Sequence, residues 1–175
     1  MPIVCHKPQF GFTLIELIIT LAIATILLTV AVPGMSRFIN NNRLATVAND
    51  FIGDLSLARS EALKRGSQAG VCKGSASGCA GAGTPWANGW IVFADVDQNE
   101  TWSANDVLLR VREALPPNTA ITVSTGSNNP IIYGSQGQVV LGTPETFILC
   151  NSQINRKKDI ALTAGGRHAV TEGAC

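Results

Sequence analysis

Six side chains that carry oxygen donors follow one another at regular spacing in the middle of the chain. They stand at the first, third, fifth, seventh, ninth and twelfth positions of one segment: Asp95, Asp97, Asn99, Thr101, Ser103 and Asp106. EF-hand loops coordinate calcium with this spacing. However, Glu100 occupies the sixth position, where such a loop needs glycine, and Asp106 is shorter than the usual final glutamate. We therefore expect an ordinary polar loop with Asx turns, no metal and no cofactor, and keep Asp95, Asp97, Asn99 and Asp106 as weak calcium candidates.

Four of the five cysteines come after the long apolar segment described below, and the odd one, Cys5, comes before it. An even number of cysteines in a small domain is typical of disulfides formed in an oxidising compartment. Cys72, Cys79, Cys150 and Cys175 allow three pairings. We favour Cys72 with Cys79, a short local loop, and Cys150 with Cys175, which ties down the C-terminal tail. Zinc is the competing interpretation, but the chain has no C-x-x-C pair.

Basic side chains gather near the C-terminus and are candidates for contacts with DNA phosphates: Arg156, Lys157, Lys158, Arg167 and His168. The net charge of the chain is only +1, which excludes a strongly basic nucleic-acid-binding protein. His168 follows glycines and Arg167 and has no evident partner that would orient it as a general base. We therefore expect no enzymatic activity and no small-molecule substrate.

The apolar segment is long enough to cross a membrane. Residues 12–32 include 13 Phe, Leu, Ile or Val side chains and a single charge, Glu16. Inserting those side chains gains about 4 to 8 kcal/mol, against at most about 3 kcal/mol for a carboxylate at mid-membrane. A cleaved secretory signal is the alternative, but the apolar run is too long for one and no A-x-A-like site follows it. We therefore predict a membrane-spanning helix.

An amphipathic helix follows the apolar segment. Apolar residues recur at steps of three and four: Leu44, Val47, Ala48, Phe51, Leu55, Ala58 and Ala62. Lys64 and Arg65 suit the last turn of a helix, and Gly66 suits its left-handed cap. The two segments join most simply as one helix over residues 12–65, which Pro33 should bend or loosen.

Beyond Gly66, short runs broken by Gly, Pro, Asn and Ser predict antiparallel strands. The candidate strands are residues 68–73, 89–94, 107–113, 120–124, 130–133, 138–141, 146–150, 159–163 and 168–171. The small polar residues between the first two candidates predict a loop tip. The predicted fold class is α+β, with one long N-terminal helix packed on an antiparallel β-rich head.

The stretch GFTLIELI at residues 11–18 resembles the class III signal of type IV pilins and type II secretion pseudopilins. The resemblance implies cleavage by a prepilin peptidase after Gly11 and N-methylation of the new N-terminus, Phe12. Glu16 then becomes the fifth mature residue and Pro33 the twenty-second, both as in that family. It also implies that Glu16 pairs, during assembly, with the methylated amine of a neighbouring subunit. Carboxylate and ammonium groups, each unfavourable in lipid, offset one another when paired.

Two further segments, residues 40–72 with the sequence ARSEA and residues 89–111, resemble the GspH/FimT group of minor pilins and pseudopilins. The resemblance implies a leader at residues 1–11, a transmembrane helix at 12–33, a periplasmic half-helix at 34–66 and a head at 67–175. The expected protein is a single-pass inner-membrane subunit that assembles with other pilins or pseudopilins at a filament's priming or tip complex. FimT-like members bind DNA through a G-R-x-R element. Gly166 and Arg167 match its first half, but Ala169 replaces the second arginine, so a DNA receptor is the alternative function.

Overall fold

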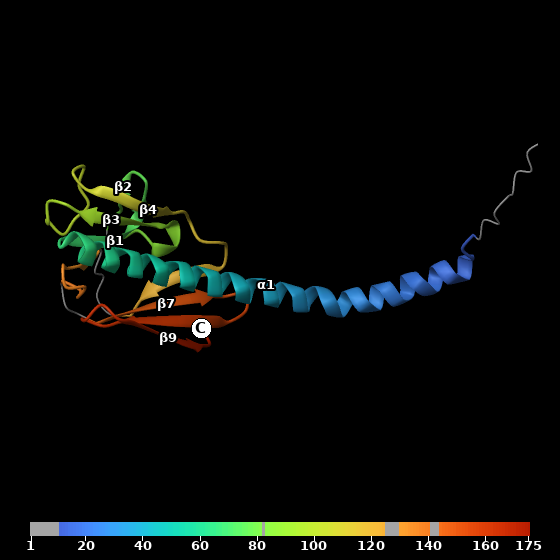
Figure 1. The fold of residues 1–175 in the computed structure, drawn as a ribbon. Helices are drawn as coiled ribbons and strands as arrows, with labels where there is room; N and C mark the ends of the chain where they lie inside the picture. The colour runs from blue at the N-terminus through green and yellow to red at the C-terminus, as the bar shows by residue number, and fades with distance from the viewer. Residues whose placement is uncertain (1–10, 82, 125–129, 141–143) are drawn as a thin grey trace, which may run out of the picture. The chain divides into compact units, whose positions relative to one another are not determined.

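The computed structural model describes residues 11–81, 83–124, 130–140 and 144–175 (Figure 1). The chain divides into two compact units, Met1–Ile39 and Asn40–Cys175, which we call the N-terminal unit and the globular unit. Helix α1, Leu14–Arg65, contributes to both and is helical through Pro33 without a break. The α+β fold class predicted from the sequence, one long N-terminal helix with antiparallel strands, is confirmed.

In the N-terminal unit, the hydroxyl groups of α1 are satisfied within the helix. Thr20, Thr25 and Thr29 each donate to the carbonyl three residues earlier, at 2.7 to 2.9 Å. A threonine that bonds its own backbone presents little polarity to its surroundings. Within the described residues, α1 is the one helix long and apolar enough to cross a membrane.

In the globular unit, α1 buries the face that the sequence predicted. Leu44, Val47, Ala48, Phe51, Leu55, Ala58 and Ala62 are all buried. The helix ends as predicted, because Gly66 has a φ of 61°. The amide of Ser67 donates to the carbonyl of Ala62 at 3.2 Å and that of Gly66 to Leu63 at 3.4 Å, the pair of bonds that defines a Schellman cap.

The first sheet of the globular unit is antiparallel, with strand order β2-β1-β3-β4. Its strands are β1, Gln68–Ser75; β2, Gly78–Cys79; β3, Trp90–Asp95; and β4, Val107–Arg112. Strand β6, Ile131–Tyr133, also pairs with β1. Every residue of β3 is buried, so this strand lies at the centre of the sheet.

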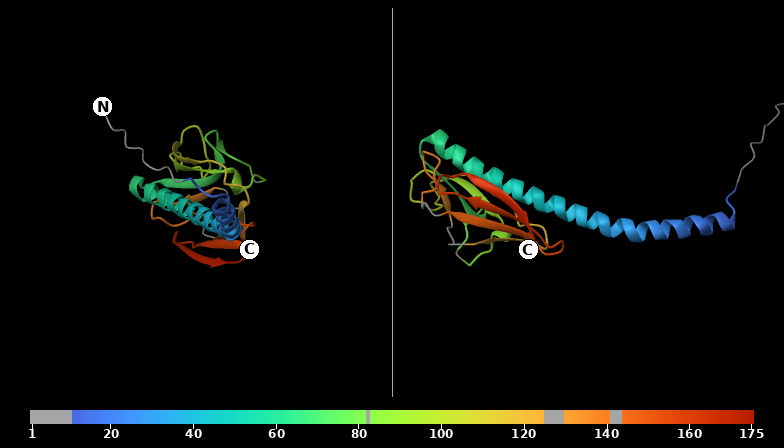
Figure 2. Two further views of the ribbon diagram at one scale, coloured as in Figure 1. Left: turned by 90° about the vertical axis from the view of Figure 1, so that its right-hand side faces the viewer. Right: turned by 90° about the horizontal axis from the view of Figure 1, so that it is seen from below.

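The second sheet has strand order β5-β7-β8-β9. Its strands are β5, Thr119–Val123; β7, Glu145–Asn151; β8, Arg156–Leu162; and β9, His168–Gly173. Phe51 of α1 joins the two sheets, with its ring 5.2 Å from that of Trp90 and 4.9 Å from that of Phe147. Residues 40–65 of α1, in teal, lie along both sheets (Figure 2).

Two features differ from the sequence prediction. The predicted loop tip contains β2 and a short 3-10 helix, η1, Trp86–Asn88, whose Trp86 is buried. Of the predicted strand 138–141, Leu141 lies outside the described residues, and the remainder has only one isolated bridge, between Val139 and Tyr133. The physical reason is that its amides bond different neighbours: Val139 donates to Ala164 and Val140 to Ile132.

Candidate functional site

The first candidate site is the N-terminal end of α1, where the sequence analysis placed Gly11, Phe12 and Glu16. All three residues are exposed, Phe12 to 84%. The amide of Glu16 donates to the Thr13 hydroxyl at 3.3 Å, so Thr13 acts as the N-cap. Glu16 therefore lies in the first turn, where the helix dipole favours a negative charge. Among the described residues, none supplies a cation to its carboxylate.

The apolar surface of this helix is not covered by any other part of the chain that the structure describes. Its large side chains are at least half exposed at nearly every position: Phe12, Leu14, Ile15, Leu17, Ile18, Ile19, Leu21, Ile23, Ile26, Leu27, Leu28 and Val32. A continuous exposed apolar surface of this length requires an apolar environment, either lipid or other helices. The arrangement suits insertion and helix packing.

A buried carboxylate on the other half of α1 was missed in the sequence analysis. Asp54 is fully buried and accepts hydrogen bonds from three side chains of the first sheet. Trp90 Nε1 lies 2.9 Å from Asp54 Oδ2, Arg110 lies 2.7 Å from Oδ1, and Arg112 Nε lies 2.8 Å from Oδ2. The hydrogen bond to Asp54 raises the pKa of Arg112, and the charge of Asp50 adds to this effect.

The position of Asp54 in the sequence could have predicted its burial. It directly precedes Leu55 on the helix face that also holds Phe51, so a charge there had to be buried and paired. The sequence could not name the partners, which come from β3 and β4. The cluster fixes α1 against the centre of the first sheet.

The acidic loop between β3 and β4 brings together part of the predicted calcium set. Carboxylate oxygens of Asp95, Asp97 and Asp106 lie within 4.8 Å of one another. Asp106 accepts the amides of Val96 at 2.9 Å and Ser103 at 2.6 Å. Burial raises the pKa of Asp95, against the effect of the amides that it binds. Asp95 and Asp106 therefore accept N–H groups of their own loop, and Asp97 accepts the hydroxyl of Ser103 at 3.1 Å.

Asn99 uses its side-chain oxygen within the loop. Its side-chain oxygen accepts the amide and the hydroxyl of Thr101, both at 2.8 Å, which forms the expected Asx turn.

Both disulfides have the pairing favoured from the sequence. Cys72 in β1 is bonded to Cys79 in β2, with their Cα atoms 5.6 Å apart. Cys150 in β7 is bonded to Cys175, with their Cα atoms 5.8 Å apart. The first bond closes the hairpin of the first sheet, and the second attaches the C-terminal tail to the second sheet.

Three of the five candidate DNA-binding residues are paired with acids. Arg156 and Lys158 both contact Glu172 of β9, Arg156 at 3.1 Å. Lys157 contacts Asp159 at 2.7 Å. Along strand β8, Lys157 points to the face opposite that of its two neighbours. The three cations therefore do not form one unpaired surface.

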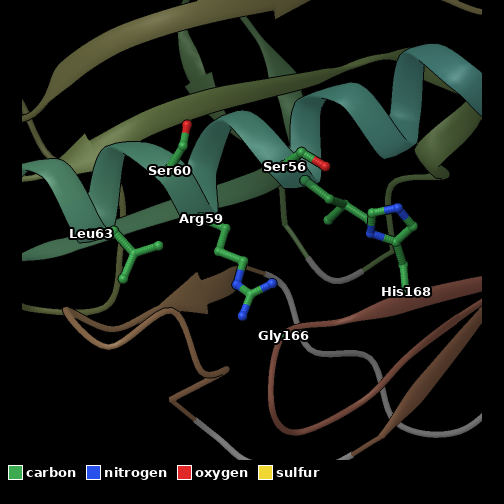
Figure 3. A pocket seen from close by; sticks show the side chains of 7 residues that line it. Ser56, Arg59, Ser60, Leu63, Gly166 and His168 are labelled. Carbon is green, nitrogen blue, oxygen red and sulfur yellow. The ribbon is translucent and has the colours of Figure 1, made fainter.

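Arg167 and His168 lie at the turn between β8 and β9, and both are exposed. No acid among the described residues pairs with either side chain. A pocket of about 220 Å³ between this turn and α1 is lined by His168, Gly166 and Arg59 (Figure 3). Arg59 donates to the carbonyls of Gly137 at 2.9 Å and Gly165 at 3.3 Å, so its charge holds the turn in place.

Comparisons with known proteins agree with this geometry. Residues 47–166 match the family described as type II transport protein GspH, and residues 6–32 match the prokaryotic N-terminal methylation motif. No curated protein matches the chain.

Solved structures of two proteins share the fold. The type IV minor pilin FimU of Pseudomonas aeruginosa strain PAO1 is 16% identical, with a TM-score of 0.58, over 77% of this chain and 92% of that one. The minor pseudopilin EpsH from the type 2 secretion system of Vibrio cholerae is 17% identical, with a TM-score of 0.51, over 75% of this chain and 97% of that one.

Proposed function

Because this chain belongs to the GspH family of type II transport proteins, we propose that it is a minor pilin or pseudopilin subunit that assembles through its N-terminal helix. One observation carries the proposal. The large apolar side chains of α1 before Pro33 that the structure describes are exposed, and a single carboxylate, Glu16, lies in the first turn. Such a surface is stable in lipid or between sister helices, and the one charge specifies the register of packing.

The N-terminal segment is processed before assembly. A prepilin peptidase cleaves after Gly11 and methylates Phe12, in support of which residues 6–32 match the N-terminal methylation motif. Glu16 then pairs with the methylated amine of a neighbouring subunit. Pro33 marks the end of the membrane-spanning part, residues 12–33, and residues 34–66 continue as the periplasmic half of the helix.

The subunit resides in the inner membrane with its β-rich head, residues 67–175, in the periplasm. The two disulfides support an oxidising compartment for the head. Its partners are other pilins or pseudopilins, at the priming or tip complex of a type IV pilus or a type II secretion pseudopilus. The subunit binds these partners and catalyses no reaction.

A pilus-associated DNA receptor is the alternative function. Arg167, which lies beside His168, favours it, because its side chain is exposed and pairs with no acid among the described residues. The ion pairs of Arg156, Lys157 and Lys158 with Glu172 and Asp159 weaken it, because a paired cation releases fewer counterions when it meets a phosphate.

Substitution of Glu16 tests the assembly proposal. We expect Glu16→Ala to leave the amount of membrane-inserted chain unchanged and to remove the chain from sheared filaments. Glu16→Gln keeps the side chain's shape without its charge and should fail equally. Glu61→Ala is the matched control, because Glu61 lies on the same helix and pairs only with neighbours on its own helix, Lys64 and Arg65. Normal recovery of Glu16→Ala in sheared filaments contradicts the proposal.

A further inference from the structure

Asn99 is the first residue of a sequence motif that has no role in the proposed assembly. Glu100 and Thr101 follow it, so the segment reads N-x-T with a residue other than proline in the middle. No other asparagine in the full sequence has a serine or threonine two residues later. N-oligosaccharyltransferases recognise this pattern, and a true acceptor must lie in a surface loop.

The loop between β3 and β4 presents this asparagine outward. Asn99 and Thr101 are both exposed. Both hydrogen bonds from Thr101 end on Asn99 Oδ1, at 2.8 Å each. The amide nitrogen Nδ2 is therefore on the side away from Thr101, and no acceptor within the described residues occupies it. Donors on Oδ1 also make the protons on Nδ2 more acidic, which favours their loss when a bond to carbon forms.

The rest of the loop holds Asn99 in place. Buried Asp95 accepts the amides of Asn99 at 3.3 Å and of Glu100 at 2.9 Å. Gln98 and Glu100 have φ angles of 56° and 63°, so the chain turns on both sides of Asn99. Trp102 packs edge-on against Phe93, with ring centroids 5.6 Å apart, and anchors the segment directly after Thr101.

We propose that Asn99 is a modification site that accepts an oligosaccharide from a polyprenyl-diphosphate-linked donor. Nδ2 attacks the anomeric carbon of the first sugar, and the new nitrogen–carbon bond replaces the carbon–oxygen bond to the diphosphate. The polyprenyl diphosphate leaves with that bond's electron pair, and Nδ2 loses one proton to a base of the transferase. Nothing is oxidised or reduced. The inference rests on the proposed function in one respect, because it requires the head to be in the periplasm with the transferase.

Mass spectrometry of the full-length chain from its native membranes tests the inference. The peptide that contains Asn99 is fragmented by electron transfer, which keeps the glycan attached to its residue, and sugar fragment ions identify the added mass. We expect one glycan on Asn99 in the wild type, none in Asn99→Gln or Thr101→Ala, and an unchanged glycan in Thr101→Ser. Asn105→Gln is the matched control, because Asn105 is exposed in the same loop and has no hydroxyl residue two positions later. Asp97→Ala tests whether the acid two residues before Asn99 is also required.

The same spectra separate this inference from the proposed function. If the Cys150–Cys175 disulfide is formed and the Asn99 peptide is unmodified, the glycosylation inference alone is overturned. A glycan that persists in Asn99→Gln overturns it as well. Reduced cysteines without a glycan overturn the periplasmic placement and the inference with it. A glycosylated chain that is absent from sheared filaments contradicts the assembly proposal and leaves glycosylation supported.

Discussion

Trp90 donates its indole N–H to the buried carboxylate of Asp54 at 2.9 Å and thereby joins α1 to the central strand of the first sheet. Two arginines of β4 complete the cluster, Arg110 at 2.7 Å and Arg112 at 2.8 Å. This contact fixes the second half of α1 to the sheets, whereas the proposed assembly uses the first half.

Asp54→Asn should destabilise the globular unit by roughly 2–3 kcal/mol, because it removes the charge that two arginines and an indole share. This cost is smaller than that of breaking a fully buried ion pair, because the side chains of Arg110 and Arg112 are 43% and 31% exposed and regain contact with water. Urea unfolding of the full chain in detergent measures the change. Asp50→Asn is the control, since the side chain of Asp50 is 41% exposed and forms an ion pair with Arg112 at 3.2 Å. It should cost less than about 1 kcal/mol. If the two substitutions lower the free energy of unfolding equally, burial of Asp54 does not increase its contribution to stability.

The ion pairs of β9 predict a dependence of stability on pH. Lys158, with help from Arg156, holds the pKa of Glu172 below its ordinary value of 4.5. A carboxyl group whose pKa is lowered by folding stabilises the fold at pH values above its pKa in the unfolded chain. This stabilisation is lost as the pH falls through the pKa of the folded protein. The melting temperature of the wild type should therefore exceed that of Glu172→Gln at pH 7. The difference should begin to shrink as the pH falls below 4.5 and should disappear below the folded pKa of Glu172. The difference should also shrink in high salt, because Glu172 is exposed. A gap that widens towards acid pH contradicts the assignment.

DNA binding, if the alternative function holds, should depend on Arg167 and not on Lys157. Arg167→Ala removes an exposed and unpaired cation and should lower the affinity for duplex DNA and reduce the salt slope by about 1. Lys157→Ala removes a cation already paired with Asp159 and should leave both unchanged. Fluorescence anisotropy of the full chain in detergent over a salt series measures both quantities. Equal weakening by the two variants would mean that the ion pair with Asp159 opens on DNA.

Removal of calcium should leave the stability of the head unchanged, because Asp95 and Asp106 already accept backbone amides of their own loop. We expect equal melting temperatures in calcium and in EDTA, whereas a tightly bound ion would raise the value in calcium. Asp106→Ala should lower the melting temperature in both conditions, since it leaves the amides of Val96 and Ser103 without their acceptor. A drop on adding chelator that Asp106→Ala abolishes would establish the loop as a calcium site.

Features that depend on neighbours along the chain could be predicted from the residue order. The buried face of α1 from Leu44 to Ala62 follows from helical periodicity, and its end at Gly66 follows from the need for a positive φ. The apolar segment around Glu16 could also be recognised from the sequence, because length and composition decide whether a helix can enter lipid.

The partners of Asp54 and the ion pairs of the basic residues could be established only from the tertiary structure. Asp54 binds residues 36 to 58 positions away, and Glu172 meets Lys158 through the register of two paired strands. Residues 138–140 are Gln, Val and Val, but the amides of Val139 and Val140 donate to two different neighbours, so no strand forms there. The local sequence pattern specifies which side chains must be buried or paired. The packing of the sheets against the helix decides which distant residues those side chains contact.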